Sequence, residues 1–179
     1  MITVLIGKSA SGKDTMLRDM KKHGAVDIVT YTTRPKRVGE VDGKDYHFVS
    51  EEFFLYSMEK GFFAETRSYN TLVQGKPQKW YYGSQAISKD ALKKNKDYVV
   101  ILDIQGAKAY LDYYGADNIK IRYLDVPDEV REERAKKRGS FDKTEWDRRV
   151  KDDAKVFSKE HIDELRSFLG RNFEMCANF

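Results

Sequence analysis

Cysteine is almost absent from this chain, in which Cys176 is the only one. A single cysteine excludes an internal disulfide and is typical of a reducing compartment, so we expect a cytoplasmic protein. The three histidines, His23, His47 and His161, lack the spacing of a metal-binding motif. The apolar run at residues 2–6 is too short for a signal peptide or a membrane span and has no basic flank. We therefore expect no membrane partner.

Repeats, low-complexity tracts and linkers rich in Pro, Gly or Ser are also missing, so 179 residues predict one domain. The net charge of +4 is only a mild excess, which fits a small anionic substrate as well as weak contact with nucleic acid. However, no basic stripe is interleaved with aromatic residues, and a nucleic-acid partner is not expected. The sequence leaves a homodimer open.

The most informative motif that is present is GKSASGK at residues 7–13, directly after the apolar run 2–6. A strand, a glycine-rich loop and a lysine in this order build a cradle for a polyphosphate, because the loop N–H groups converge on phosphate oxygens. The following segment, 13–23, has a helical pattern, and its N-terminus would point at the anion. The residues assigned to this cradle are Gly7, Ser9, Ala10, Ser11, Gly12, Lys13, Asp14 and Thr15.

One position departs from the usual motif, in which a Ser or Thr hydroxyl after the lysine binds Mg²⁺. Here Asp14 follows the lysine and Thr15 comes next. A carboxylate is also a hard oxygen ligand, so Asp14 and Thr15 are the candidate Mg²⁺ ligands. The alternative is that Asp14 only stabilises the positive end of the helix.

Apolar, β-branched runs alternate with helical patterns along most of the chain. The expected strands are 2–6, 28–31, 98–103 and 119–126, and the expected helices are 13–23, 84–95, 105–114, 127–138 and 144–169. Such alternation predicts an α/β fold, with a parallel sheet of the P-loop NTPase type flanked by helices. We divide it into a core (1–33, 84–138 and 144–179), an insertion (34–83) with a helix starting at Ser50, and a short lid (139–143).

The segment 32–49, TTRPKRVGEVDGKDYHFV, resembles the nucleotide-monophosphate-binding segment of guanylate kinases, T-T-R-x-x-R-x-G-E-x-x-G-x-D-Y-x-F. Further matches follow in the family's order and cover nearly the whole chain. They are Phe63-Ala64-Glu65, Tyr81-Tyr82-Gly83-Ser84, Ile101-Leu102-Asp103 with Gln105-Gly106, Arg134 with Arg138-Gly139, and Arg149. The resemblance implies a nucleoside monophosphate kinase that uses ATP and Mg²⁺ to convert GMP or dGMP to the diphosphate.

The resemblance also assigns roles to residues. Arg34 and Arg37 would hold the acceptor phosphate with Tyr46 and Tyr82, and Glu65 would accept hydrogen bonds from the N1–H and N2–H₂ groups of guanine. The full acceptor set is Thr30, Arg34, Arg37, Glu40, Tyr46, Glu65, Tyr82, Ser84 and Asp103. The catalytic set is Lys13, Arg34, Arg138 and Arg149, with Arg134 added to the ATP-binding loop. The residues alone also allow plainer readings: a solvated loop for Arg34 and Arg37, a surface acid for Glu65, and a basic helix face for the lid arginines.

Other departures from the family concern the acceptor. The family has a second aspartate after the position of Asp103, and this chain lacks it, which leaves the base preference open. The connection 66–80 is longer than usual, and the sequence ends just past the expected last strand, from which we expect lower stability or a compensating partner. One rival reading is a kinase of the same fold that acts on another deoxynucleotide or on a sugar phosphate such as ribose 1,5-bisphosphate. The other is a non-catalytic scaffold domain, which the intact Gly7, Gly12 and Lys13 disfavour.

Overall fold

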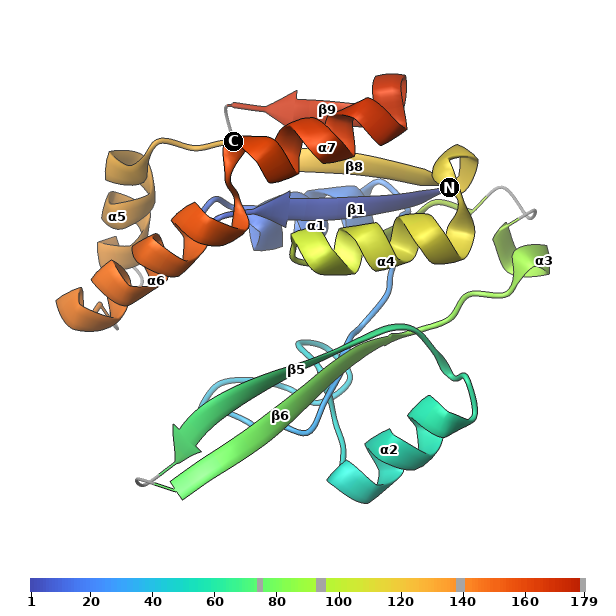
Figure 1. Cartoon of the computed structure of the whole chain (residues 1–179), viewed down its shortest axis with the longest axis horizontal. Coiled ribbons are helices and arrows are strands. Elements are labelled where there is room, and N and C mark those ends of the chain that lie inside the picture. The colour runs from blue at the N-terminus through green and yellow to red at the C-terminus, as the bar shows by residue number, and fades with distance from the viewer. Residues whose placement is uncertain (74–75, 93–95, 138–140, 178–179) are drawn as a thin grey trace. The chain divides into compact units, whose positions relative to one another are not determined.

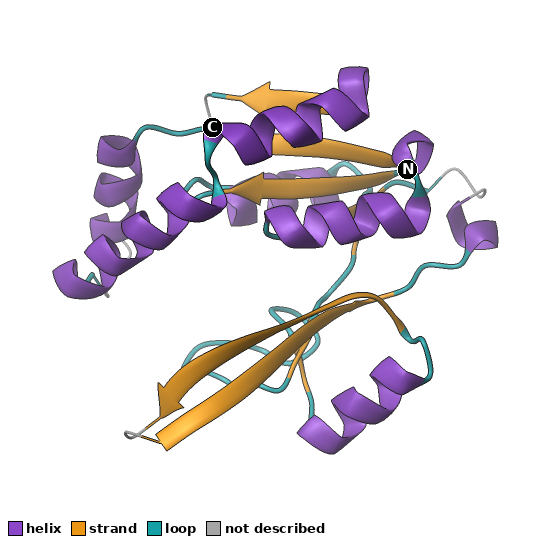
Figure 2. Ribbon diagram, viewed as in Figure 1, coloured by secondary structure: helices purple, strands orange, loops and turns teal. Residues whose placement is uncertain are grey.

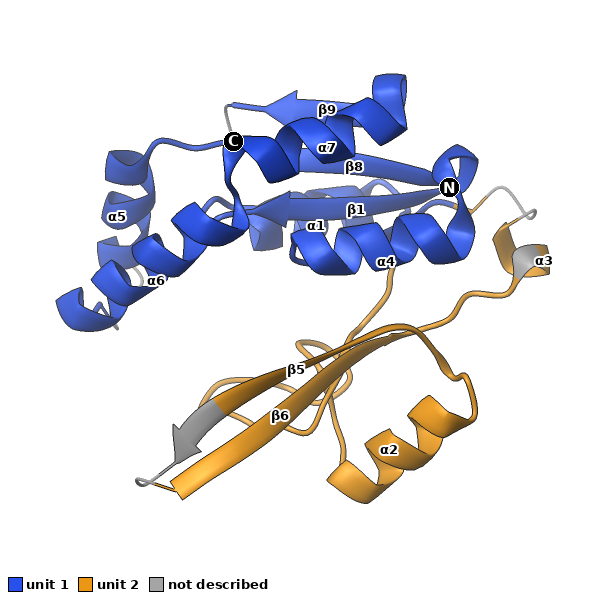
Figure 3. Ribbon diagram, in the orientation of Figure 1, with its two compact units in different colours: residues 1–26, 97–179 blue, residues 27–96 orange. Residues whose placement is uncertain are grey.

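The computed structural model shown in Figure 1 describes residues 1–73, 76–92, 96–137 and 141–177. The chain forms two compact units, coloured separately in Figure 3. Unit 1 consists of Met1–Val26 and Asp97–Phe179, and unit 2 is Asp27–Lys96. The predicted insertion 34–83 therefore falls within unit 2, and the phosphate-loop motif lies in unit 1.

Unit 1 is built on a five-stranded sheet with the order β2-β7-β1-β8-β9. Its strands are β1 (Ile2–Gly7), β2 (Val26–Asp27), β7 (Tyr98–Ile101), β8 (Ile119–Leu124) and β9 (Phe173–Cys176). The central strand β1 pairs in parallel with β7 and β8, and β8 pairs in parallel with β9. Every residue of β1 is buried, as expected for a central strand covered on both faces.

Helices flank this sheet, as Figure 2 shows. The flanking helices are α1 (Lys13–Lys22), α4 (Ile104–Tyr114) and α7 (Lys159–Leu169), with short 3₁₀ turns η1 (Ala116–Asn118) and η2 (Gly170–Asn172). Two further helices, α5 (Asp128–Lys137) and α6 (Lys143–Val156), lie beyond the carboxyl end of β1 (Figure 1). Met16 of α1 packs in one cluster with Leu5, Val99 and Leu124 of the sheet. The predicted α/β class is confirmed. No helix in the described parts of the chain is both long and apolar enough to cross a bilayer.

Unit 2 contains a four-stranded sheet with the order β4-β3-β6-β5. Its elements are β3 (Tyr31–Thr32), β4 (His47–Phe48), α2 (Glu51–Glu59), β5 (Phe63–Val73), β6 (Lys76–Gln85) and α3 (Lys89–Leu92). The side chain of Ser50 accepts a hydrogen bond from the Phe53 N–H, so α2 begins where the sequence predicted. The rings of Phe54 and Phe63 stack 4.6 Å apart, and a Cβ at Gly83 would lie 3.0 Å from each of them. A larger residue at this point of the core would require the two rings to shift by a few tenths of an ångström.

Three predicted elements differ from the structure. The strand expected at 28–31 is wrong, because β2 ends at Asp27 and β3 begins at Tyr31, in the two different sheets. The helix expected at 84–95 is also wrong in its first part, since Ser84 and Gln85 pair with β5, and among the described residues of this range only Lys89–Leu92 is helical. The long helix expected at 144–169 breaks into α6 and α7, where the Ser158 hydroxyl accepts from the His161 N–H and caps a new helix.

Candidate active site

The loop between β1 and α1 is tightly folded around two glycines. A Cβ at Gly7 would lie 2.7 Å from the Ser11 hydroxyl and 3.0 Å from the Leu124 carbonyl oxygen, so no larger residue fits. Gly12 precedes α1 with a φ of 102°, a left-handed conformation that favours glycine. Ala10, with a φ of 59°, is the one non-glycine residue of positive φ in the described chain. The loop is therefore compact, and its backbone has positive φ angles at Ala10 as well as at the two glycines.

Lys13 lies at the start of α1 and folds back over this loop. Its ammonium group donates to the carbonyl oxygens of Gly7, at 2.6 Å, and Lys8, at 3.0 Å. Asp14 and Thr15 follow in the first turn of α1, where both are exposed. The Thr15 hydroxyl accepts from Arg18 at 3.3 Å. One positive charge and a carboxylate thus lie at the helix end of the loop.

Two arginines of α5 reach the backbone of the same loop. Arg134 donates to the Ser11 carbonyl oxygen at 3.0 Å, and Arg131 donates to the Ser9 carbonyl oxygen at 2.9 Å. Asp153 of α6 accepts from the Ser9 N–H at 2.8 Å. Sequence reasoning assigned Arg134 but missed Arg131 and Asp153. The available signal was the spacing of three residues between the arginines, which puts them on one face of a helix.

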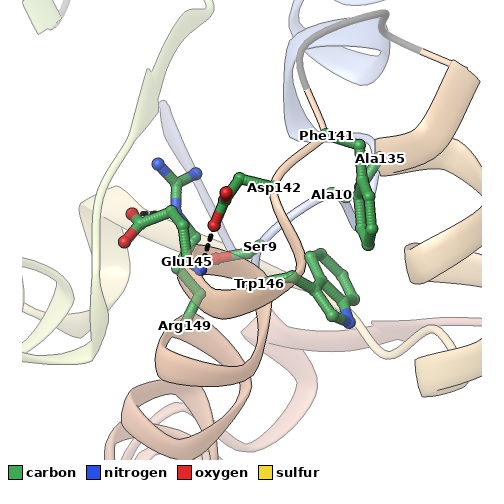
Figure 4. A pocket seen from close by; sticks show the side chains of 8 residues that line it. All are labelled: Ser9, Ala10, Ala135, Phe141, Asp142, Glu145, Trp146 and Arg149. Atoms are coloured by element: carbon green, nitrogen blue, oxygen red, sulfur yellow. Dashed lines mark hydrogen bonds and ion pairs between the residues drawn. The ribbon is translucent and has the colours of Figure 1, made fainter.

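A pocket of about 160 Å³ adjoins the loop (Figure 4). It is lined by Ser9, Ala10, Ala135, Phe141, Asp142, Glu145, Trp146 and Arg149. Arg149 donates to Glu145 at 2.8 Å, and Arg148 binds the same carboxylate through two nitrogens. These hydrogen bonds, first from Arg148 and then from Arg149, lower the pKa of Glu145 to about 2. Arg138 and positions 139–140 of the predicted lid lie outside the described residues.

Arg34, in unit 2, is a buried cation with a matched anion. Its side chain is 4% exposed and forms two hydrogen bonds with the Glu40 carboxylate, at 2.7 and 3.0 Å. Burial alone would lower the pKa of Arg34, but the hydrogen bond and charge of Glu40 outweigh it and raise the pKa. Glu40 also accepts from the Arg37 N–H at 2.7 Å, and the Arg34 guanidinium lies 5.3 Å from the Tyr46 ring centre. The solvated-loop reading is therefore wrong for Arg34, whereas Arg37 is exposed.

Glu65 is buried as well, which overturns its reading as a surface acid. Its side chain is 2% exposed, and the Ser84 hydroxyl donates to it at 2.7 Å across the β5–β6 pair. Arg67 lies on the same strand with its Nε 3.9 Å from the second carboxylate oxygen. Tyr82 of β6 packs edge-on against Tyr46, with ring centres 6.0 Å apart. Six predicted acceptor residues thus take part in polar or ring contacts within unit 2: Arg34, Glu40, Tyr46, Glu65, Tyr82 and Ser84.

A model of the guanylate kinase family matches residues 1–159 of this chain. The chain belongs to the guanylate kinase family. Guanylate kinases from Wolinella succinogenes and Onion yellows phytoplasma are 36% and 31% identical to it, over 83% and 98% of this chain and 67% and 80% of theirs. A guanylate kinase from Nitratidesulfovibrio vulgaris is 38% identical over 60% of this chain, and the match spans half of that relative. The crystal structure of guanylate kinase from Anaplasma phagocytophilum has the same fold, with a TM-score of 0.63 and 23% identity over 99% of this chain and 76% of that one.

Membership of the guanylate kinase family confirms the predicted family, fold class and class of enzyme, a nucleoside monophosphate kinase.

The two remaining acceptor residues have backbone or capping contacts. The carbonyl oxygen of Thr30 accepts from the His47 N–H at 2.9 Å in unit 2. Asp103 belongs to unit 1, where its carboxylate accepts from the Gly106 N–H at 2.8 Å and caps α4.

Proposed function

We propose that this protein transfers the γ-phosphoryl group of ATP to GMP or dGMP, giving ADP and GDP or dGDP. The observation that carries the acceptor assignment is the buried carboxylate of Glu65, held by Ser84. Guanine offers an N1–H and an N2–H₂ donor side by side, which a carboxylate accepts together, whereas adenine has no such donor pair. The single cysteine further supports a cytoplasmic enzyme.

On the donor side, the proposed roles follow from charge. The loop N–H groups and the Lys13 ammonium would bind the ATP phosphates, and Arg134 would support the loop through the Ser11 carbonyl. Within the described residues, no three or more His, Cys, Asp or Glu side chains group to hold a metal. Mg²⁺ in kinases needs only one or two protein groups besides phosphates and water, so Asp14 and Thr15 fit this requirement. Bound there, Mg²⁺ would neutralise charge on the ATP phosphates.

On the acceptor side, Arg34, Arg37, Tyr46 and Tyr82 would hold the nucleotide's phosphate. An oxygen of this phosphate attacks the γ-phosphorus of ATP, the bond to the ADP oxygen breaks, and no covalent enzyme intermediate forms. Two anions must approach each other in this reaction, so the fork-shaped donors of arginine are suited to it. Glu40 would keep Arg34 oriented. Thr30, Ser84 and Asp103 complete the proposed acceptor set.

The lid arginines Arg138 and Arg149 would neutralise the transferring group. The lid 139–143 and the insertion 34–83 would close when both substrates bind, and exclude water that otherwise hydrolyses ATP. A second acceptor class deserves a test because of the missing acid after Asp103 and because Arg67 lies beside Glu65. Another deoxynucleotide or a sugar phosphate is that alternative.

The test is a panel of acceptors assayed by coupled detection of ADP. We expect kcat/KM to be highest for GMP and dGMP. Glu65→Gln should lower that value by about tenfold to hundredfold, since one hydrogen bond that reads the base is worth about 1–3 kcal/mol, and change other acceptors less. Glu59→Gln, an exposed acid of α2 in the same unit, is the matched control. Two results would contradict the guanine assignment: equal wild-type activity on all monophosphates, or a loss of kcat/KM in Glu65→Gln that is equal for all of them.

A further inference from the structure

Ser9, the third residue of the phosphate-binding loop, is bound by two side chains from distant helices. Asp153 of α6 accepts from the Ser9 N–H at 2.8 Å and from its hydroxyl at 3.4 Å. Arg131 of α5 donates to the Ser9 carbonyl oxygen at 2.9 Å and to Asp153 at 3.2 Å. The amide, carbonyl and hydroxyl of Ser9 therefore all have partners from this one ion pair.

The pair is deeply buried, which makes it costly to maintain. The Arg131 side chain is 1% exposed and that of Asp153 is 14% exposed. Arg131 also donates to Asp128 at 2.6 Å and lies 5.5 Å from the Trp146 ring centre. Its Nε is buried without a hydrogen-bond partner. Burying an ion pair is seldom favourable by itself, so an arginine held with an unsatisfied nitrogen indicates that its remaining contacts matter.

The two helices that supply the pair are those on either side of the predicted lid. Arg131 lies in α5, which ends at Lys137, and Asp153 lies in α6, which begins at Lys143. The pair thus joins the loop to both of these helices. Hydrogen bonds to the two peptide groups of Ser9 restrict the backbone torsions that aim the following loop amides. A loop that is fixed before the nucleotide arrives loses less entropy when it binds.

We propose that Arg131 and Asp153 are positioning residues for the donor nucleotide: they hold the phosphate-binding loop in its binding conformation through Ser9. This inference rests on the proposed use of the loop for ATP. Neither residue is proposed to touch the reacting atoms. Arg131 has a second effect, because it neutralises a carboxylate that would otherwise repel the phosphates at the loop. Loss of Arg131 alone therefore weakens ATP binding more than loss of Asp153 alone.

The test is titration calorimetry of the whole protein with MgATP in the absence of any acceptor. We expect Arg131→Met and Asp153→Ala to weaken ATP binding by about tenfold to hundredfold, the cost of misplacing binding groups by about an ångström. Asp153→Asn keeps an oxygen that accepts from the Ser9 N–H and should recover most of the affinity. Lys137→Met, which removes an exposed ion pair with Glu133 on the same helix, is the control and should bind ATP normally.

A double variant separates positioning from simple stability. Arg131→Met combined with Asp153→Ala removes both buried charges, and replacing such pairs by apolar groups often leaves stability unchanged. We expect its melting temperature to return toward that of the wild type while ATP binding stays weak, with KM for the acceptor unchanged. Recovery of both stability and ATP affinity would refute the proposal, and so would single variants that bind ATP like the wild type. If the wild type itself does not bind ATP, the proposed function fails instead.

Discussion

The ion pair between Arg34 and Glu40 offers the sharpest test of the acceptor side, through the substitution Glu40→Gln. The carboxylate accepts three hydrogen bonds, from two nitrogens of Arg34 at 2.7 and 3.0 Å and from the Arg37 N–H at 2.7 Å. Glutamine has nearly the same shape but only one oxygen. If the glutamine oxygen occupies the position of Glu40 Oε2, which accepts two of the hydrogen bonds, the new NH₂ group lies 2.7 Å from a donor nitrogen of Arg34. At least one hydrogen bond is lost, and a buried cation loses its counter-charge.

The magnitude follows from burial. A hydrogen bond to a charged group contributes about 1.5–3 kcal/mol, and breaking a fully buried ion pair costs about 3–5 kcal/mol. The Arg34 side chain is 4% exposed and that of Glu40 is 19% exposed, so partial solvation reduces the loss. We expect a destabilisation of about 2 kcal/mol, on the scale of one such charged hydrogen bond. For a chain of this size, that corresponds to a drop in Tm of about 4–8 °C.

The assay is thermal unfolding of the wild type and Glu40→Gln, with Glu133→Gln as the control. Glu133 pairs with Lys137 where both side chains are exposed, so this substitution should leave Tm unchanged.

The hydrogen bond from Arg34 lowers the pKa of Glu40 below its ordinary value of 4.5. Because its pKa is lower in the folded state, the ionised Glu40 carboxylate stabilises the fold at pH values above its ordinary pKa. This stabilisation disappears as the pH falls toward the folded-state pKa. The Tm difference should therefore be full at pH 7 and narrow below pH 4.5. A difference of less than about 1 °C at pH 7 would show that the pair is no stronger than a surface pair, and would refute the reasoning.

Other predictions concern the loop and α6. Gly7→Ala places a Cβ 2.7 Å from the Ser11 hydroxyl. We expect urea unfolding to show about 1–3 kcal/mol of destabilisation, as for other overpacked sites, and ATP binding to be weaker. A variant with the stability and ATP affinity of the wild type would contradict the close packing. Lys13→Ala should lower kcat by about a hundredfold to a thousandfold, as removal of one transition-state donor does. Binding of the acceptor, measured by calorimetry, should persist. An unchanged kcat would exclude a role for Lys13 in phosphoryl transfer. For Glu145→Gln, Tm should be lower than that of the wild type at pH 7. Two arginine partners lower the Glu145 pKa from 4.5 to about 2, so the ionised carboxylate contributes its full stabilisation at pH values above 4.5. This difference should shrink as the pH falls from 4.5 toward 2, and a difference that grows there would reverse the assigned sign.

The compact backbone of the glycine-rich loop was predictable because its determinants are adjacent in sequence. Gly7 ends the buried strand β1, Gly12 directly precedes α1, and Lys13 begins that helix, which is the order that the motif requires. The start of α2 at Ser50 is local in the same way, since the capping hydroxyl acts three residues along the chain. The α/β class followed from the periodicity of long elements, the most reliable signal that a single sequence carries.

Elements whose boundaries depend on distant partners were not predictable. The run at 28–31 is apolar and β-branched, but these features indicate burial and do not say which sheet a residue joins. Ile28 is indeed 8% exposed, although it belongs to neither flanking strand. Ser84 and Gln85 become strand because β5 pairs with them, which no local pattern indicates. The contacts of Arg131 and Asp153 with Ser9 span 122 and 144 positions along the chain, so only the folded structure reveals them.

Three cations proposed to meet a phosphate, Lys13, Arg34 and Arg149, already have partners in the protein, and the strength of each partner decides what the cation does in the proposed reaction. Lys13 binds neutral carbonyl oxygens, which a phosphate replaces readily because an anion attracts an ammonium group more strongly. Arg149 pairs with Glu145 where the side chains are 46% and 42% exposed, so water screens the pair and releasing it costs little. Arg34 is buried against Glu40, and its release would leave two unpaired charges. In the proposed reaction, Lys13 and Arg149 therefore exchange partners when the substrates bind. Arg34 keeps its carboxylate and serves as a fixed point from which the acceptor phosphate is oriented.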